Sequence, residues 1–357
     1  MQVLIVWDRM GDYHRSRVNA YRKIYPKDIL YTADLGTADK LYKWKNTEHS
    51  NHFVLSEKEA EQNDVLRRFK MFKALVKTHD INKVVLSGYG RREYLLFALW
   101  LKQKGIDTYM FAESWYAGKD FIDSLKGRFL KSFVKGVFVS GTNAERHFLT
   151  RLKFSGKRLR VGYSVVDNSH FHYVRSLASV KKATSNKPVL LCVARYAEEK
   201  NLTLLIAAFE ASKLASNWQL QLVGGGPLKD KLQDNILRPD TVKLMSWQGY
   251  DDLPLLYQNA SCFILPSQFE PWGLVVNEAM AASLPIIISD ACGCFPDLLS
   301  DNGYGFEAKS KSELILVLNQ LHANSDQDIY EMGKRSNKII TEYCPNTWSK
   351  SINKLMS

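Results

Sequence analysis

Two glutamates eight residues apart, Glu270 and Glu278, flank the start of a helical pattern and could bind a ligand rich in hydroxyl groups. The residues from the loop into the helix are Pro271, Trp272, Gly273 and Leu274. The first N–H groups of a helix have no partner within it, so the loop predicts an anion site at the positive end of a helix. A carboxylate has two acceptor oxygens, which suits a vicinal diol.

The spacing of these residues predicts which part of a ligand each would meet. From Gly273 to Glu278 a helix rises roughly 7 Å, at about 1.5 Å per residue. That rise is similar to the span from a pyrophosphate to the ribose beyond it, so Glu278 is a candidate ribose ligand. Glu270 would hold hydroxyls of a sugar attached to the phosphate. The alternative is an ordinary helix whose acidic start is favoured by the helix dipole.

A second pair of residues is Arg195, which ends the apolar segment 188–195, and Lys200, five residues further on. An arginine at a strand end and a lysine at the next helix start could close on one pyrophosphate, since arginine offers a planar fork and lysine a point charge. The alternative is a pair of surface cations. The segment 218–227 is a predicted strand that ends in three glycines, which we expect to allow close backbone approach.

The spacings Arg-x4-Lys and Glu-x7-Glu together resemble those of the family 4 glycosyltransferases, retaining enzymes with the GT-B fold. Residues 278–281 and 285–287 resemble the same family pattern, whereas Ser283 stands where the family usually carries glycine. The resemblance implies that Glu270, Arg195 and Lys200 act in catalysis. It also implies a donor site formed by Gly11, Arg195, Lys200, Gly249, Tyr250, Glu270, Pro271, Trp272, Gly273, Leu274 and Glu278.

The first half of the chain follows the family pattern only in outline. In the family, the loop after the first strand carries glycine and approaches the donor phosphates or the acceptor. Gly11 is the only glycine in that loop here. Glu113 follows the predicted strand 107–112, where many family members carry histidine, and is a candidate catalytic or acceptor contact. Strand ends of this kind point at the ligand crevice of an open α/β sheet. Arg9, His14 and Arg17 could bind an acidic acceptor or be surface charges.

The alternation of strands and helices predicts an α/β protein of two Rossmann-like parallel-sheet domains, which in the GT-B fold face each other across a cleft. We expect an acceptor domain over 1–173, an unstructured linker over 174–187 and a nucleotide-sugar domain over 188–344. Residues 345–357 predict a helix that crosses back to the first domain. Within the first domain we expect a loop over 36–55 and a helix over 57–79.

The 357 residues include 49 lysines and arginines against 37 acids, so partners are expected to be anionic. Residues 119–160 alone carry a net charge of +8, from eleven basic and three acidic residues. Within them, 120–135 predicts an amphipathic helix with Phe121, Ile122, Leu125, Phe129 and Phe133 on its apolar side. Its cations Lys126, Arg128, Lys131 and Lys135 are candidates for contact with an anionic membrane surface or an acceptor. A core-facing helix with a solvated basic face is the alternative.

Together with these patterns, the family resemblance implies a retaining, metal-independent glycosyltransferase without a cofactor, which moves a sugar from a nucleoside-diphosphate sugar to a hydroxyl acceptor. The expected acceptor is a lipid-linked or growing glycan of a cell-surface polysaccharide. A sugar-nucleotide epimerase of the same fold and a basic nucleic-acid-binding protein are the alternatives; the aromatic residues, at apolar positions, argue against nucleic acid as a partner.

The sequence also predicts where the protein resides. Residues 1–7 form an apolar strand without the basic lead of a signal peptide, and five cysteines lack a two-pair metal spacing. We therefore expect a cytoplasmic protein with free thiols that attaches peripherally to the inner face of the plasma membrane.

Overall fold

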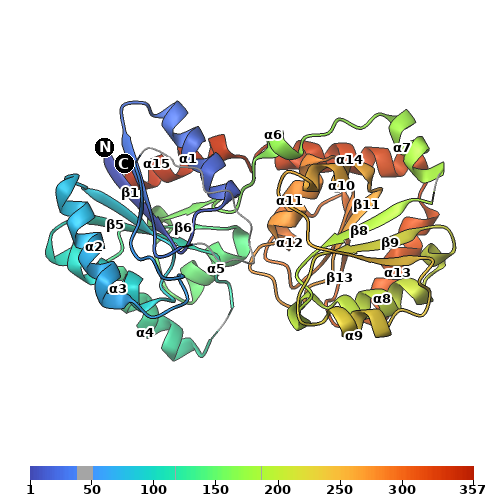
Figure 1. The fold of residues 1–357 in the computed structure, drawn as a ribbon, viewed down its shortest axis with the longest axis horizontal. Helices are drawn as coiled ribbons and strands as arrows, with labels where there is room; N and C mark the ends of the chain where they lie inside the picture. The colour runs from blue at the N-terminus through green and yellow to red at the C-terminus, as the bar shows by residue number, and fades with distance from the viewer. Residues whose placement is uncertain (38–50, 117, 186) are drawn as a thin grey trace. The chain divides into compact units, whose positions relative to one another are not determined.

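The computed structural model describes residues 1–37, 51–116, 118–185 and 187–357. The chain forms two compact units, the first made of residues 1–165 and 345–357 and the second of residues 166–344. Each unit is a parallel sheet with helices on both faces (Figure 1). The α/β class with two Rossmann-like units, as predicted, is confirmed.

The first unit contains a sheet in the order β3-β2-β1-β4-β5-β6-β7. Its strands are β1 (Gln2–Trp7), β2 (Ile29–Asp34), β3 (His52–Val54), β4 (Lys83–Leu86), β5 (Asp107–Ala112), β6 (Gly136–Val139) and β7 (Leu159–Val161). Its helices are α1 (Asp12–Ile24), α2 (Val65–Thr78), α3 (Arg92–Gln103), α4 (Asp120–Lys131), α5 (Thr142–Thr150) and α15 (Pro345–Met356). The last helix packs on α1 and β6, and Trp348 is buried beside Phe111 and Phe138.

The second unit contains a sheet in the order β10-β9-β8-β11-β12-β13. Its strands are β8 (Val189–Val193), β9 (Gln219–Val223), β10 (Val242–Met245), β11 (Cys262–Leu265), β12 (Ile286–Ser289) and β13 (Gly303–Phe306). Its helices are α6 (Asn168–Phe171), α7 (Leu177–Ser185), α8 (Leu202–Ala211), α9 (Lys229–Asp234), α10 (Leu253–Asn259), α11 (Leu274–Ala281), α12 (Phe295–Leu298), α13 (Lys311–Ala323) and α14 (Asp326–Ile340).

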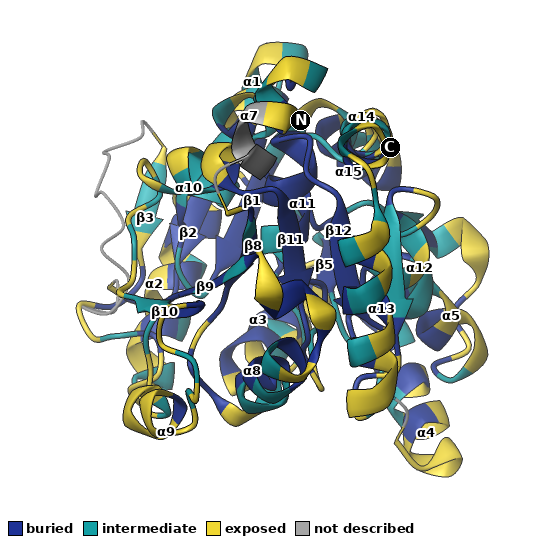
Figure 2. Cartoon of the chain, turned by 90° about the vertical axis from the view of Figure 1, so that its right-hand side faces the viewer, coloured by how far each residue is buried: buried dark blue, intermediate teal, exposed yellow. Residues whose placement is uncertain are grey.

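Both sheets have the unbroken apolar strands that helices on two faces require. In β1 and β11, for example, the central residues are buried on both sides of the sheet, as the dark blue strands in Figure 2 show. Each sheet has its own hydrophobic core, which fixes the strand ends where the candidate site residues lie. In the described part of the chain, no helix is both long enough and apolar enough to span a membrane.

The segment expected to be an unstructured linker, 174–187, was predicted wrongly. It contains α7, which packs against α14 and buries Val180, so an apolar side chain anchors a largely polar helix. The chain changes unit between Val165 and Val166, eight residues before the expected domain end.

Two boundaries expected inside the first unit differ in the structure. The helix expected over 57–79 is present but begins only at Val65. In the turns before it, the Glu59 carbonyl accepts a hydrogen bond of 2.8 Å from the buried guanidinium of Arg68. The loop expected over 36–55 ends in β3, which pairs with β2. Residues 38–50 of that loop lie outside the described residues.

Candidate active site

The second sheet has a topological switch point between β8 and β11. From β8 the chain first adds strands on one side, β9 and β10, and then on the other side, beginning with β11. Ligands of open α/β sheets bind in the crevice outside the carboxyl ends of strands at such a point. The loop after β8 carries Arg195 and Lys200, and the loop after β11 carries Glu270. The fold therefore brings the two predicted motifs to one edge of the sheet.

Lys200 and Glu270 form an ion pair across this switch point. Both side chains are largely buried, with 17% and 12% of their surfaces exposed. The backbone on the carboxylate side is fixed as well, since the Glu270 N–H donates to the Ala291 carbonyl and the Glu270 carbonyl accepts from the Gly293 N–H, at 3.2 and 2.9 Å. The position of Glu270 is thus set by the loops after both β11 and β12.

Arg195 lies on the same loop and remains more than half exposed. Its guanidinium donates to Glu199 at 2.5 Å, and this hydrogen bond lowers the pKa of the Glu199 carboxyl below its usual value. The two predicted phosphate ligands therefore each have a glutamate partner, Glu199 for Arg195 and Glu270 for Lys200. Binding of a phosphate by either cation remains a prediction, and it would require exchange of these partners.

Two polar residues that the sequence analysis did not single out hold this arrangement. Asn201 adopts a left-handed conformation at φ 55°, donates to the Ala308 carbonyl at 2.8 Å and accepts from the Gln268 amide at 2.9 Å. The Gln268 N–H in turn donates to the Glu199 carbonyl at 2.8 Å. These bonds join the loops after β8 and β11. The signal in the sequence was an asparagine directly after Lys200, a residue that tolerates this conformation.

The glycine turn after β9 packs directly on the loop after β8. A Cβ atom on Gly224 would lie 1.9 Å from the Ala194 carbonyl oxygen, and one on Gly226 would lie 2.6 Å from that of Tyr196. The predicted close backbone approach is confirmed at both positions.

Helix α11 begins at Leu274, as predicted from the sequence. Gly273 precedes it at φ 104°, a conformation that L side chains rarely adopt. Trp272 is buried and donates its indole N–H to Asn277 at 2.8 Å, while Pro271 stays partly exposed. The loop thus enters the helix in one fixed path, and the anion site at its start remains a prediction.

Glu278 lies inside α11 and is fully buried. Its carboxylate accepts a hydrogen bond of 2.6 Å from the Tyr257 hydroxyl on α10. No local pattern indicates this contact, because Tyr257 is 21 residues away on another helix. In this conformation Glu278 joins two helices, and its assignment to a ribose remains a prediction.

Gly249 and Tyr250 follow β10 on the same side of the second unit as the loop of α6. Gly249 is exposed, and the Tyr250 ring stacks on His170 at 4.1 Å with an interplanar angle of 4°. The His170 ring also meets the Tyr250 carbonyl oxygen at 3.0 Å. One face of the Tyr250 ring is therefore covered by His170, and the predicted donor contact of Tyr250 remains a prediction.

The serine at the end of α11 takes the conformation that a glycine would take. Ser283 has φ 57° and lies two residues after the end of α11 at Ala281. Its hydroxyl donates to the Tyr173 carbonyl at 2.9 Å. A hydrogen bond thus offsets the backbone strain where the sequence departs from the family pattern.

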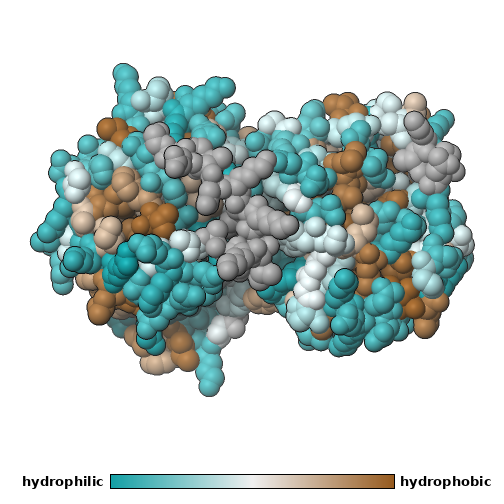
Figure 3. All heavy atoms as spheres, in the orientation of Figure 1, coloured by the Kyte–Doolittle hydropathy of each residue, from teal (hydrophilic) through white to brown (hydrophobic). Residues whose placement is uncertain are grey.

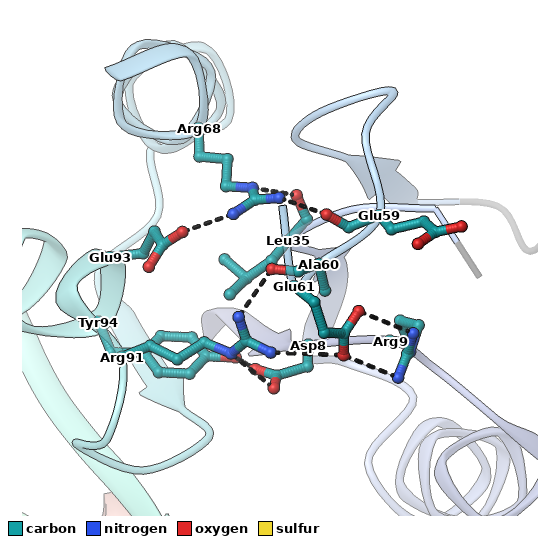
Figure 4. Close-up of polar contacts among 10 residues, drawn as sticks. All are labelled: Asp8, Arg9, Leu35, Glu59, Ala60, Glu61, Arg68, Arg91, Glu93 and Tyr94. Carbon is teal, nitrogen blue, oxygen red and sulfur yellow. Dashed lines mark hydrogen bonds and ion pairs between the residues drawn. The ribbon is translucent and has the colours of Figure 1, made fainter. Parts of the chain in front are cut away.

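The first sheet has its own switch point, between β1 and β4, and charged residues are paired there (Figure 4). Asp8 accepts from Arg91 at 2.7 Å and from the Tyr94 hydroxyl at 2.5 Å, and burial together with Asp8 raises the pKa of Tyr94. Arg9 makes two bonds to Glu61, at 3.0 and 3.1 Å. Its charge is therefore already engaged within the first unit.

The other basic residues at this edge are also engaged. Arg17, expected at the surface or at an acceptor, is buried and donates to the Val165 carbonyl at 2.7 Å. Gly11 forms the start of α1, and its N–H donates to the His14 ring at 3.0 Å. Burial and the nearby Arg17 keep the pKa of His14 well below its usual value, so this ring is a neutral acceptor.

A cavity of about 260 Å³ opens at the carboxyl ends of β4 and β5. Glu113 lies in it and accepts a hydrogen bond of 2.8 Å from the Ser164 hydroxyl. The remaining lining residues are Ser87, Gly88, Tyr89, Gly90, Phe111, Ala112, Ser114 and Tyr163. A carboxylate beside aromatic rings suits a hydroxyl-bearing ligand. We call this space the Glu113 pocket.

Two Rossmann-like units with a last helix that returns to the first unit define the GT-B class of fold. The structure of the Anabaena HepE protein in complex with UDP-glucose superimposes with a TM-score of 0.76 over 100% of this chain and 99% of that one, at 16% identity. Residues 175–338 match the family model described as glycosyl transferases group 1. This match lies within the second unit and covers less than half of the chain.

Two curated relatives are similar over part of the chain. A sulfoquinovosyl transferase of Arabidopsis thaliana is 30% identical over 42% of this chain, and an α-monoglucosyldiacylglycerol synthase of Acholeplasma laidlawii is 31% identical over 46%. The matched regions span 29% and 42% of these relatives' own lengths.

Proposed function

We propose that this chain transfers a sugar from a nucleoside-diphosphate sugar to a hydroxyl acceptor, with retention of configuration at the sugar. The observation that carries the proposal is the Lys200–Glu270 ion pair at the β8/β11 switch point, in which a cation lies beside the carboxylate that we propose as the sugar ligand. The family match over residues 175–338 and a fold shared with a protein bound to UDP-glucose support it.

The residues at this edge suit the departure of a diphosphate. Arg195 and Lys200 would exchange their glutamate partners for phosphate oxygens, and the N–H groups at the start of α11 would add partial positive charge. Glu270, released from Lys200, would accept hydrogen bonds from hydroxyls of the transferred sugar. This charge stabilisation needs no divalent cation, so we propose a metal-independent reaction.

The acceptor belongs to the first unit in this proposal. Glu113 would accept a hydrogen bond from the attacking hydroxyl in the Glu113 pocket. The hydroxyl would attack on the face from which the diphosphate departs, which preserves the configuration. The acceptor that we propose is a lipid-linked or growing glycan of a cell-surface polysaccharide.

Product analysis tests this function against its rivals. The purified chain is incubated with UDP- and GDP-sugars, with and without hydroxyl acceptors, and the products are separated and their anomeric configuration is assigned by NMR. We expect release of nucleoside diphosphate that rises with acceptor, together with a glycoside of unchanged anomeric configuration. Conversion of the donor alone into a second nucleotide sugar would instead indicate an epimerase.

A further inference from the structure

Helix α4 exposes its apolar side chains to solvent. Phe121, Ile122, Leu125 and Phe129 are 79%, 55%, 57% and 47% exposed. A helix of a folded domain ordinarily turns such residues to the core. The sequence left open whether this helix faces the core, and the structure excludes that alternative for these four residues. We call them the α4 ridge.

The orientation of α4 is fixed by its opposite face. Asp123, Gly127 and Leu130 are buried, and a Cβ atom on Gly127 would lie 2.0 Å from the Leu152 carbonyl oxygen. Residues on the ridge are about half a turn of the helix away from Gly127, at 100° per residue. In Figure 2, α4 is blue on its inner side and yellow on its outer side, and Figure 3 shows apolar surface at that lower edge of the first unit.

The charge around the ridge is positive. Both acids of α4 are engaged, because Asp120 pairs with Arg151 and Asp123 accepts from the Gly118 N–H at 2.9 Å. The segment 151–158 runs beside α4, as the bond from Lys131 to the Lys153 carbonyl at 2.9 Å shows. The exposed cations of α4, its flanks and this segment include Lys119, Arg128, Lys135, Lys153 and Lys157.

The four cations singled out from the sequence differ in their surroundings. Lys135 pairs with Asp107 at 2.6 Å, Lys131 holds the Lys153 carbonyl, and Lys126 lies over the Tyr89 ring at 4.3 Å. Arg128 is exposed on the helix itself. Tyr89 lines the Glu113 pocket, so the Lys126 contact places that pocket directly beside α4.

We infer that the α4 ridge docks on an anionic lipid bilayer and that the Glu113 pocket receives the hydroxyl of an acceptor resident in that bilayer. An interfacial helix lies in the plane of the membrane with its apolar side inserted among the headgroups and cations at its flanks, and α4 offers both features. Exposed apolar residues are ordinarily scattered, whereas these four form one continuous row. The acceptor part of the inference rests on the proposed function, and the docking part does not.

Vesicle cosedimentation tests the docking. The full chain is mixed with vesicles of phosphatidylcholine alone or of phosphatidylcholine with phosphatidylglycerol, and UDP binding is measured on the same preparations. The ridge variant carries Phe121→Ser, Leu125→Ser and Phe129→Ser. A matched control carries Leu66→Ser, Leu237→Ser and Leu255→Ser, at leucines outside α4 that are at least comparably exposed. Because all six side chains are exposed, the variants should fold, which melting temperatures verify.

We expect the wild-type chain and the control to bind the anionic vesicles, and to bind them more weakly at high salt. We expect the affinity of the ridge variant to be at least about tenfold lower. Failure of the wild type to bind anionic vesicles at low salt, or equal binding by the ridge variant, would overturn the inference. Self-association that the ridge variant abolishes, without vesicle binding, would identify a second copy of the chain as the occupant instead. If one of these outcomes is found while UDP binding is retained, the docking inference has failed and the proposed function has not.

Discussion

The ammonium group of Lys200 and the carboxylate of Glu270 meet across a topological switch point, although 70 residues separate them in the chain. Neither motif alone indicates more than a charged loop. Their meeting at the carboxyl ends of β8 and β11 is what makes them a candidate donor site.

Arg195 provides a test of catalysis that is separate from folding. Its side chain is 58% exposed, so Arg195→Ala should change the free energy of unfolding by no more than about 0.5 kcal/mol. Turnover should fall on the order of a hundredfold, because the charge it meets grows as the diphosphate departs. Turnover and melting temperature are measured together, and a loss of activity that tracks a loss of fold would indicate a structural role only.

Variants of Tyr257 and Glu278 distinguish a structural role of Glu278 from a ligand-binding role. Tyr257→Phe removes a donor to a buried carboxylate and should lower the free energy of unfolding by about 1.5–3 kcal/mol. If Glu278 also meets a ribose, Glu278→Ala should weaken nucleotide binding by a similar amount, whereas Tyr257→Phe should leave it nearly unchanged. Calorimetric titration of both variants with a nucleoside diphosphate measures this difference. If Glu278→Ala binds the nucleotide as tightly as Tyr257→Phe does, Glu278 is not a ribose ligand.

Ser283 is expected to tolerate glycine better than alanine. Ser283→Ala keeps the positive φ and loses the bond to the Tyr173 carbonyl, so it should cost about 1–2 kcal/mol of stability. Ser283→Gly loses the same bond but relieves the strain, and should cost less than half as much. Urea unfolding of the two variants measures this difference, and an equal loss in both would show that the backbone there is unstrained.

The buried cysteines predict loss of stability at alkaline pH. Burial raises the pKa of Cys192 and of Cys292 from 9.0 to about 12 and also raises those of Cys262 and Cys294. A thiol of raised pKa keeps its proton in the folded state and loses it on unfolding, so the unfolded state binds fewer protons between pH 9 and 12. Stability therefore falls as the pH rises through this window, by up to about 1.4 kcal/mol per pH unit for each thiol.

Denaturant unfolding at a series of pH values checks this slope. Cys192→Ala should reduce the slope, although it lowers the stability at neutral pH, and Cys344→Ala is the control because Cys344 is only partly buried. A slope unaffected by Cys192→Ala would contradict the assignment.

Local patterns were sufficient to predict most of the strands and the two-unit architecture, and together with the family resemblance they placed Lys200 and Glu270 in one site. These depend on apolar runs and on the rule that strand ends meet at one edge of a parallel sheet. Contacts between side chains distant in sequence were not predictable. Tyr257 on Glu278 and Gln268 on Asn201 are such contacts. The direction of the α4 ridge depended in the same way on Gly127 packing against the Leu152 backbone, which periodicity alone does not reveal.

Calorimetric titration with UDP and GDP of the wild-type chain, Lys200→Ala and Lys243→Ala tests the central claim most directly. Lys243 is an exposed lysine on β10 of the same unit and serves as the matched control. The account predicts that the wild type and Lys243→Ala bind one of the two nucleotides with equal affinity. It predicts that Lys200→Ala binds that nucleotide about ten- to a hundredfold more weakly, since a charge-assisted hydrogen bond is lost. Equal affinity of Lys200→Ala and wild type, or no binding of either nucleotide by the wild type, would contradict it.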